Sequence, residues 1–426
     1  MFGVVAFGAI MALGGLVGLL FFARPTSSAV EMRNLTTFPQ FTVESFLDGS
    51  FFTDVSLWYA DTYPLREPMV SADHAIDGLF GVAVDGAMVG GNVVADQIPV
   101  EESQAAPSVT AVTPPAAPPD ERVVAEDIQN NIMEGVYVRD GAAYSIYYFD
   151  QSAADAYIAA MNTAAEKLDG IATVYSIMSP ANSITLDADE AQKVGGSDQQ
   201  QTLDYLATRY DKRVKQVEIV DDIIEHRSEY LYFYTDHHWT QLGAYYAYVA
   251  FCKEKGIEPR SLDSWRHENF GVFHGTYYDT LVSVGGARDD TVDAWIPSAT
   301  NTMKCWPDGS DGEMTEVPIV DEAAAEWEAP MKYSCFLGGD EPLEIMENPN
   351  LHDGSSCLVV KDSYGNAFAP LLVDSYQTVH VIDFRETDKN ICDYVRENNI
   401  QDVIFLTGMK IGLTESVANT LLSEVS

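Results

Sequence analysis

Short apolar runs that alternate with amphipathic stretches constrain the fold of this chain more than any other feature. Ile171–Met178 is an apolar run with β-branched and aromatic residues, and it follows a helical stripe in Ala153–Leu168 that Gly170 ends. The alternation continues toward the C-terminus. Strands that alternate with helices form a mostly parallel sheet covered on both faces. The sequence therefore predicts an α/β fold.

The predicted strands share a short apolar core bounded by polar or turn-forming residues. They are Ile171–Met178, Val217–Val220, Leu231–Tyr234, Cys357–Val360, Val379–Ile382 and Val403–Leu406. The predicted helices share apolar positions at helical spacing. They are Ala153–Leu168, Gln241–Lys253, a stretch that ends near Val373, and Ile391–Arg396. Residues 285–350 break this rhythm, which predicts an irregular elaboration.

The N-terminal residues indicate a membrane segment. Phe2–Ala23 is almost wholly apolar and uncharged, and about 20 such residues are enough to cross a bilayer. We expect residues 1–23 to be a transmembrane helix that anchors an extracytoplasmic protein, with a cleaved signal segment as the alternative. The positive-inside rule does not favour this orientation, because Arg24 and Arg33 lie on the proposed outer side.

A proline-rich segment divides the remaining chain. Ser103–Pro119 carries no charge and five prolines, a composition that cannot pack a core and predicts a flexible insertion over residues 103–120. It separates a membrane-proximal region, residues 24–102, from a large domain, residues 121–426. This domain is long enough to bury a substantial core and contains the predicted strands.

Charge and cysteine usage exclude some functions. The net charge of −41 argues against nucleic-acid binding, which requires lysine and arginine to displace counterions. The five cysteines show no CxxC spacing, so the sequence predicts no structural zinc site. Cys305 and Cys335 flank a loop-rich stretch, and a disulfide between them or two free thiols fit this position equally. No cofactor is predicted.

Ser363 lies at a position typical of a nucleophile. It follows the apolar run Cys357–Val360 and precedes a helix-like stretch, and α/β sheets bind ligands beyond the carboxyl ends of their strands. A helix start also offers N–H groups to an oxyanion. Gly365 would allow close backbone approach, and Asn366 could add a side-chain donor. The alternative is that Ser363 caps the helix.

A serine nucleophile needs a base, and Asp236 and His238 can supply one. They lie two residues apart, and in an extended segment such residues point the same way. The carboxylate could fix the imidazole tautomer while the other ring nitrogen faces the serine. His237 is then a neighbour, and Trp239 either packs or stacks on a sugar. A metal site that includes His237 is the competing hypothesis, although no HExxH spacing supports it.

These two segments resemble the DHHW family, whose members are relatives of the alginate O-acetyltransferases in the SGNH-hydrolase superfamily. The resemblance is carried by Asp236-His237-His238-Trp239-Thr240, by Lys361-Asp362-Ser363-Tyr364-Gly365-Asn366, and by Pro180-Ala181-Asn182 after a predicted strand. It implies a flavodoxin-like three-layer α/β/α sandwich of the SGNH-hydrolase type. It also implies Ser363 as nucleophile, His238 as base and Asp236 as its partner.

Other residues are candidates for binding the substrate. The resemblance makes Asn182 and Asn366 candidates for an oxyanion partner, and Tyr277 could form part of a carbohydrate platform, with ordinary packing as the alternative. Two residues depart from the acetyltransferase relatives. Lys361 stands where they have glycine, and His237 stands where they have threonine.

The resemblance implies extracytoplasmic, serine-dependent acyl transfer. The expected reaction is O-acetylation or deacetylation of a cell-envelope polysaccharide through an acetyl-Ser363 intermediate, and the sequence leaves transferase and esterase open. The expected partners are a cell-surface polysaccharide and a membrane acyltransferase that supplies acetyl groups. The alternative function is a non-catalytic glycan-binding surface module on an SGNH scaffold.

Overall fold

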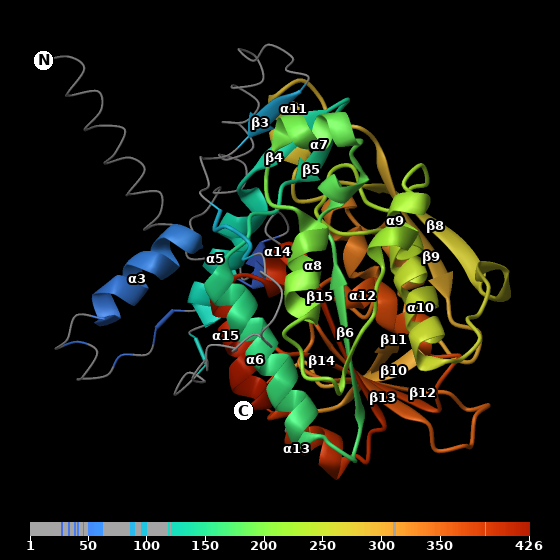
Figure 1. The fold of residues 1–426 in the computed structure, drawn as a ribbon. Coiled ribbons are helices and arrows are strands. Elements are labelled where there is room, and N and C mark those ends of the chain that lie inside the picture. Colours follow the sequence, from blue (N-terminus) through green and yellow to red (C-terminus); the bar gives the residue numbers. More distant parts are fainter. Residues whose placement is uncertain are drawn as a thin grey trace, which may run out of the picture. The chain divides into compact units, whose positions relative to one another are not determined.

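Figure 1 shows the computed structural model of the chain. It describes residues 27–28, 33–34, 38–39, 41, 46, 50–62, 86–89, 95–99, 118–119, 121–309, 312–387 and 389–426. The predicted anchor, residues 1–23, and residues 103–117 of the predicted insertion lie outside the described residues. Within the described part of the chain, no helix is both long and apolar enough to cross a membrane.

The chain divides into two compact units. Unit 1 comprises Met1–Ala83 and Tyr278–Gly286, and unit 2 comprises Val84–Tyr277 and Ala287–Ser426. In unit 1 the described elements are β1 (Ser27–Ser28) paired antiparallel with β2 (Arg33–Asn34), α3 (Ser50–Asp61) and α11 (Tyr278–Ser283). All of the predicted site residues belong to unit 2.

Among the described residues, unit 2 is built on an eight-stranded mixed sheet of order β11-β10-β12-β14-β13-β15-β6-β7. The parallel strands are β14 (Thr378–Asp383), β13 (Ser356–Lys361), β15 (Asp402–Gly408), β6 (Thr173–Ser179) and β7 (Val214–Gln216). The antiparallel strands are β12 (Glu344–Glu347), β10 (Thr302–Cys305) and β11 (Thr315–Pro318). Every residue of β13 and β15 is buried.

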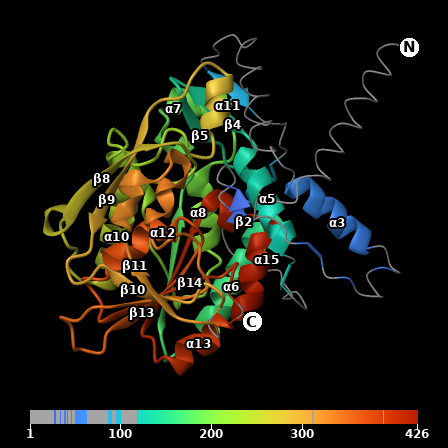
Figure 2. The same cartoon turned by 180° about the vertical axis from the view of Figure 1, so that it is seen from behind.

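Helices cover both faces of this sheet (Figures 1 and 2). One face carries α6 (Gln151–Lys167), α13 (Ile391–Glu397) and α15 (Glu415–Val425), and the other carries α10 (Gln241–Lys255) and α12 (Gly365–Phe368). Two caps set the helix starts. The Asp150 carboxylate accepts a hydrogen bond from the Ala153 N–H at 2.9 Å, and the Thr240 hydroxyl accepts one from the Gly243 N–H at 3.3 Å.

The other described elements of unit 2 surround this sandwich. The strands are β3 (Ala87–Val89), β4 (Val136–Arg139) and β5 (Ala142–Ser145) in one small sheet, and β8 (Arg266–Phe273) and β9 (Asp290–Ile296) in another. The helices are α5 (Glu121–Met133), α7 (Ala188–Val194), α8 (Gln199–Ala207), α9 (Val220–Glu225) and α14 (Met409–Gly412). The 3-10 turns are η1 (Asn182–Thr185), η2 (Leu262–Ser264), η3 (Glu322–Glu326), η4 (Ala329–Cys335) and η5 (Ala369–Leu372).

The α/β prediction is confirmed, with a sheet that is mixed rather than mostly parallel. The four buried strands β6, β13, β14 and β15 lie where the apolar runs predict them. The prediction for Val217–Val220 is wrong, because the strand is β7 and Val220 already begins α9. β7 reads Val-Lys-Gln and lies at an edge of the sheet, so it has no apolar run to signal it.

Two further predictions differ from the structure. Residues 285–350 are not an irregular elaboration, because they contain β10, β11 and β12, which extend the central sheet. Leu231–Tyr234 forms no strand, and Tyr232 makes only an isolated bridge with Trp239. All five cysteines are buried free thiols, so no disulfide joins Cys305 to Cys335.

Candidate active site

The turn that carries Ser363 is held between two buried strands. Ser363 follows β13, and the preceding Asp362 donates its N–H to the Leu406 carbonyl of β15 at 3.3 Å. The Asp362 carboxylate accepts hydrogen bonds from the N–H groups of Tyr364 at 3.0 Å and Gly408 at 2.9 Å. Burial raises the pKa of Asp362 to about 6, against the opposing effects of Arg385 and these two N–H groups.

Ser363 does not cap the helix that follows it. The N-cap of α12 is Tyr364, which makes no side-chain capping bond. The Ser363 hydroxyl instead lies 2.6 Å from Nε2 of His238, and its side chain is half-buried. The serine is therefore presented to an imidazole rather than to its own backbone.

Asp236 and His238 meet through a turn. The bridge between Tyr232 and Trp239 and the hydrogen bond from the Phe233 N–H to the His238 carbonyl at 3.3 Å close the segment that contains them. Within it, Asp236 Oδ1 accepts hydrogen bonds from the His238 N–H at 2.9 Å and from Nδ1 at 2.6 Å. This Asx-type turn, and not an extended segment, directs the imidazole toward its carboxylate.

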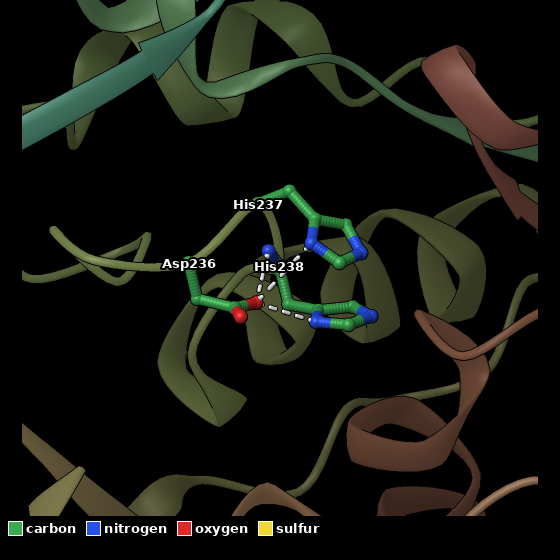
Figure 3. Close-up of side chains that lie close together, drawn as sticks. All are labelled: Asp236, His237 and His238. Atoms are coloured by element: carbon green, nitrogen blue, oxygen red, sulfur yellow. Dashed lines mark hydrogen bonds and ion pairs between the residues drawn. The ribbon is translucent and has the colours of Figure 1, made fainter. Parts of the chain in front are cut away.

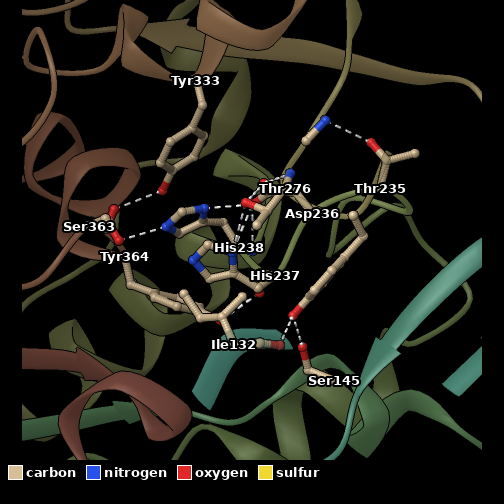
Figure 4. Close-up of polar contacts among 12 residues, drawn as sticks. Ile132, Ser145, Thr235, Asp236, His237, His238, Thr276, Tyr333, Ser363 and Tyr364 are labelled. Carbon is tan, nitrogen blue, oxygen red and sulfur yellow. Dashed lines mark hydrogen bonds and ion pairs between the residues drawn. The ribbon is translucent and has the colours of Figure 1, made fainter. Parts of the chain in front are cut away.

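The three residues form a continuous hydrogen-bonded group (Figure 4). Asp236 Oδ1 holds Nδ1 of His238, and Nε2 faces the Ser363 hydroxyl. The second carboxylate oxygen, Oδ2, accepts from both the N–H and the hydroxyl of Thr276 at 2.8 Å. In this arrangement Nδ1–H donates to the carboxylate and Nε2 is free to accept the serine proton.

The Asp236 carboxylate is held in its ionised form. Burial opposes ionisation, but His237, His238 and the Thr276 N–H together outweigh it and keep the pKa of Asp236 well below its usual value. Asp236 is 1% exposed, so water does not screen this charge. An ionised, buried carboxylate stabilises the imidazolium that forms when a histidine accepts a proton.

His237 lies against His238 (Figure 3). The ring centroids are 3.8 Å apart, and Nδ1 of His237 lies 3.6 Å from Asp236 Oδ1 and 3.3 Å from the Thr276 hydroxyl. Burial and the neighbouring His238 lower the pKa of His237 to about 3, against the opposing effect of Asp236. His237 is therefore a neutral imidazole at physiological pH.

Aromatic side chains that the sequence did not single out complete the site. Tyr333 stacks on His238 with centroids 4.3 Å apart and an interplanar angle of 17°, and its hydroxyl donates to the Ser363 carbonyl at 2.9 Å. Tyr364 donates its hydroxyl to the His237 carbonyl. Tyr333 belongs to the predicted irregular region and Thr276 to a loop, so neither lies in a pattern that could have marked it.

Two predicted sugar-stacking residues are buried. Trp239 is 0% exposed, and its indole N–H donates to the Tyr364 carbonyl at 2.9 Å. Tyr277 is also 0% exposed, with its hydroxyl 2.5 Å from the Ser145 hydroxyl and donating to the Ile132 carbonyl at 3.0 Å. Neither ring offers a face to a glycan. Both residues pack the core behind the site, which is the alternative to sugar stacking that the sequence left open.

The candidate oxyanion partners differ in how many of their polar atoms are already hydrogen-bonded. The Asn182 amide is tied to β5, because Oδ1 accepts from the Ser145 N–H at 2.6 Å and Nδ2 donates to the Ala143 carbonyl at 2.8 Å. Asn366 donates to Asp340 Oδ1 at 2.9 Å, and its own Oδ1 is buried without a partner among the described residues. The Ser363 N–H likewise has no acceptor in the described chain. It is thus an available donor beside the nucleophile.

Gly365 approaches protein and not a ligand. A Cβ at this position would lie 2.3 Å from Cβ of Lys361, so the glycine lets α12 pack against the end of β13. Lys361 is fully buried, and its amine donates to Asp340 and Asp383 at 2.9 Å. Arg385 pairs with the same two carboxylates.

The cluster of Asp236, His237 and His238 could also be considered as a metal site. Within the described residues these are the histidine, cysteine and acidic side chains close enough to share an ion, with ligand atoms within 4.8 Å of one another. Both ring nitrogens of His238 are already hydrogen-bonded, however, and Asp236 uses both oxygens. Elsewhere in the chain, His267 contacts Asp293 at 2.8 Å. The cluster fits proton transfer better than metal binding.

The fold and the site together define a class. An α/β sandwich on a mixed sheet, with a histidine-paired serine beyond the carboxyl end of β13, is SGNH-like. The model for "DHHW protein" matches residues 31–105 and 121–382. The chain belongs to the DHHW family.

Solved structures share the fold of this chain. A DHHW family protein from Eubacterium siraeum is 26% identical, covers 67% of this chain and 93% of its own, and superposes with a TM-score of 0.59. Bacillus cereus PatB1 with a sulfonyl adduct is 19% identical, with 64% and 94% covered and a TM-score of 0.54. A second structure of Bacillus cereus PatB1 is 18% identical, covers 64% of this chain and 95% of its own, and has a TM-score of 0.52. Among curated proteins, none matches the chain.

Proposed function

We propose that this chain is a serine-dependent acyl-transfer enzyme that works outside the cytoplasm on a cell-envelope polysaccharide. The observation that carries the proposal is the hydrogen-bonded group of Asp236, His238 and Ser363, with both contacts at the histidine 2.6 Å long. A glycan-binding module would not need a serine hydroxyl in line with a carboxylate-paired imidazole.

The geometry supports a two-step reaction. Ser363 Oγ attacks the carbonyl carbon of an acyl donor while His238 Nε2 takes its proton, and the leaving group then departs with that proton. The Ser363 N–H, which has no acceptor among the described residues, is the candidate donor to the developing oxyanion. In the second step an acceptor hydroxyl gives its proton to His238, its oxygen bonds to the acyl carbon, and the bond to Ser363 Oγ breaks as the serine regains a proton.

The acyl group and the acceptor follow from the family resemblance. The DHHW segments are similar to those of alginate O-acetyltransferases, so we propose acetyl as the acyl group and a polysaccharide hydroxyl as the acceptor. A membrane acyltransferase would supply the acetyl group across the membrane, and residues 1–23 would anchor the enzyme at that membrane.

The test is acylation of the full-length chain by para-nitrophenyl acetate. We expect a burst of nitrophenol and a covalent acetyl adduct, both lost in Ser363→Ala and the burst reduced at least a hundredfold in His238→Ala. Ser355→Ala and His267→Ala are matched controls, because Ser355 bonds to the exposed Asp353 and His267 to Asp293. A sulfonyl fluoride is a second probe, since PatB1 is known with a sulfonyl adduct. Equal rates and labelling in all variants would overturn the proposal in favour of glycan binding.

A further inference from the structure

His237 is a side chain that the two-step reaction does not use, although it lies next to the reacting groups. Its ring stands 3.8 Å from that of His238, at an interplanar angle of 38°. Both rings lie on the same side of the Asp236 carboxylate, and their Nε2 atoms point away from it (Figure 3). Ser363 lies at that end (Figure 4).

The contacts of His237 fix its tautomer. The Thr276 hydroxyl donates its hydrogen to Asp236 Oδ2 at 2.8 Å. Its oxygen, 3.3 Å from Nδ1 of His237, is therefore left to accept the Nδ1–H. The low pKa of the His237 imidazole, about 3, follows mainly from burial, so Nε2 carries a lone pair and no hydrogen.

This tautomer decides what His237 can bind. Nε2 has no hydrogen to give to an oxyanion, so His237 cannot serve as an oxyanion donor. It has no hydrogen-bond partner among the described residues, and the side chain is 9% exposed. A lone pair at the edge of the reacting site is an acceptor for a donor that the substrate brings.

We infer that His237 Nε2 accepts a hydrogen bond from a second hydroxyl of the acceptor, next to the hydroxyl that His238 deprotonates. The inference rests on the proposed function and narrows its substrate to acceptors with adjacent hydroxyl groups, as in a sugar ring. The two imidazole edges lie side by side, so neighbouring oxygens of one molecule can meet them together.

The transfer step keeps this second hydroxyl intact. The reacting hydroxyl loses its proton to His238 and forms the new ester bond, while its neighbour keeps its hydrogen and donates it to His237. An acceptor without the neighbouring hydroxyl gives no hydrogen bond to this lone pair, and sites built for a hydrogen bond discriminate against such analogues. His237 is thus an acceptor-binding residue for the transfer step.

The experiment compares acetyl transfer from para-nitrophenyl acetate to ethylene glycol and to ethanol, with the nitrophenol burst recorded in parallel. His237→Phe keeps an aromatic ring and removes the lone pair, and its nitrophenol burst is recorded as the reference for acylation by that variant. The preference for glycol should fall about fivefold, the equivalent of one hydrogen bond of about 1 kcal/mol. His237→Gln restores an acceptor oxygen and should recover part of the preference.

Three outcomes are decisive. An absent serine-dependent burst in the native chain would overturn the proposed function and this inference with it. A serine-dependent burst with an unchanged glycol preference in both His237 variants would overturn the inference alone. Should both variants misfold, the inference is tested in Ser363→Ala by the Nε2 nitrogen chemical shift of His237: glycol should move it more than ethanol does, and equal shifts would refute the inference.

Discussion

At the residue scale, the site depends on how Asp236 divides its two oxygens. Oδ1 holds the backbone and ring of His238, and Oδ2 holds Thr276. Each contact fixes the carboxylate from a different side, so its position does not depend on the histidine alone. A carboxylate held in this way sets the tautomer of the imidazole before any substrate arrives.

Asp236→Asn should therefore lower the acylation rate strongly and the stability of the fold only slightly. An asparagine retains the size of the side chain but favours the wrong tautomer of His238, and the comparable change in a serine protease lowers the rate about 10⁴-fold. Because the pKa of Asp236 is well below its usual value, its carboxylate stays ionised as the pH falls to about 4. The burst rate measures the effect, with Asp293→Asn as control. A loss of less than tenfold would contradict this role for Asp236.

The sequence could indicate the reacting residues but not those that hold them. Asp236, His238 and Ser363 are identified by residue type and by their position after predicted strands. Thr276 contacts Asp236 from 40 residues away in the chain, and Tyr333 contacts Ser363 from 30 residues away. Such contacts arise only when the chain folds, because neither residue belongs to a periodic apolar pattern. Even the Asp236–His238 pairing was predicted for the wrong reason, since a turn and not a strand produces it.

At the scale of elements, a glycine at position 275 allows a loop to approach the site closely. A Cβ at Gly275 would lie 2.2 Å from Cβ of Asp236 and 2.6 Å from the Thr235 carbonyl oxygen. The loop that brings Thr276 to Asp236 therefore has no room for a side chain at the preceding position. The loop and the Asp236 turn must form together.

Gly275→Ala should impair acylation by displacing Asp236. We expect a loss of at least tenfold in the burst rate, because reacting groups must stay within about 0.5 Å of their productive positions. Gly170→Ala is the matched control: its φ of +72° is strained for alanine, but nothing lies within 4 Å of the new Cβ. That variant should lose about 1 kcal/mol of stability and keep its burst rate. Equal burst rates in the two variants would contradict the proposed crowding.

The link between β13 and β15 predicts a pH dependence of stability. The pKa of Asp362 is raised to about 6, whereas that of an unfolded aspartate is about 3.9. Between these values the folded chain holds a proton that the unfolded chain has released, so the stability from this group is complete below pH about 4 and is lost as the pH rises through about 6. The loss is of the order of 2–3 kcal/mol.

Asp362→Asn should remove this dependence, because an amide does not titrate. Relative to the native chain, the variant should gain stability between pH about 4 and about 6, and the difference should then stay constant. Urea unfolding at a series of pH values measures it, and the difference at pH about 4 accounts for the non-titrating cost of the substitution. A difference that does not change with pH would show that Asp362 is not protonated in the folded state near pH 5.

At the scale of the whole molecule, the sequence predicts the centre of the sheet better than its edges. β6, β13 and β15 lie in the middle of the sheet and are almost wholly buried, so their central residues are mostly apolar and are visible as runs. β10, β11 and β12 are four residues each and carry charged residues. The sequence therefore shows no apolar run there, and only their hydrogen bonding to neighbouring strands identifies them. The residues that carry the DHHW resemblance in the sequence lie outside this antiparallel extension, although the family model spans it.

The charge of the molecule bears on which polysaccharide it can approach. The net charge is −41. Lys361, just before Ser363, and Arg385, further along the chain, are already paired with carboxylates. Lys361 and Arg385 share the carboxylates of Asp340 and Asp383, two positive charges with two negative ones. A polyanionic acceptor therefore meets a repulsive field with no unpaired cation in this cluster to oppose it.

Acetyl transfer to a polyanionic oligosaccharide should consequently become faster as salt is added. Raising the ionic strength from about 0.01 M to about 0.15 M shortens the Debye length from about 30 Å to about 8 Å. We expect kcat/KM for an alginate oligomer to rise several-fold over this range, while that for an uncharged oligosaccharide and the nitrophenol burst stay constant. A rate that falls with salt for the alginate oligomer would show the opposite field at the site. Cations outside the Lys361 cluster would then have to attract the acceptor, despite the net negative charge of the chain.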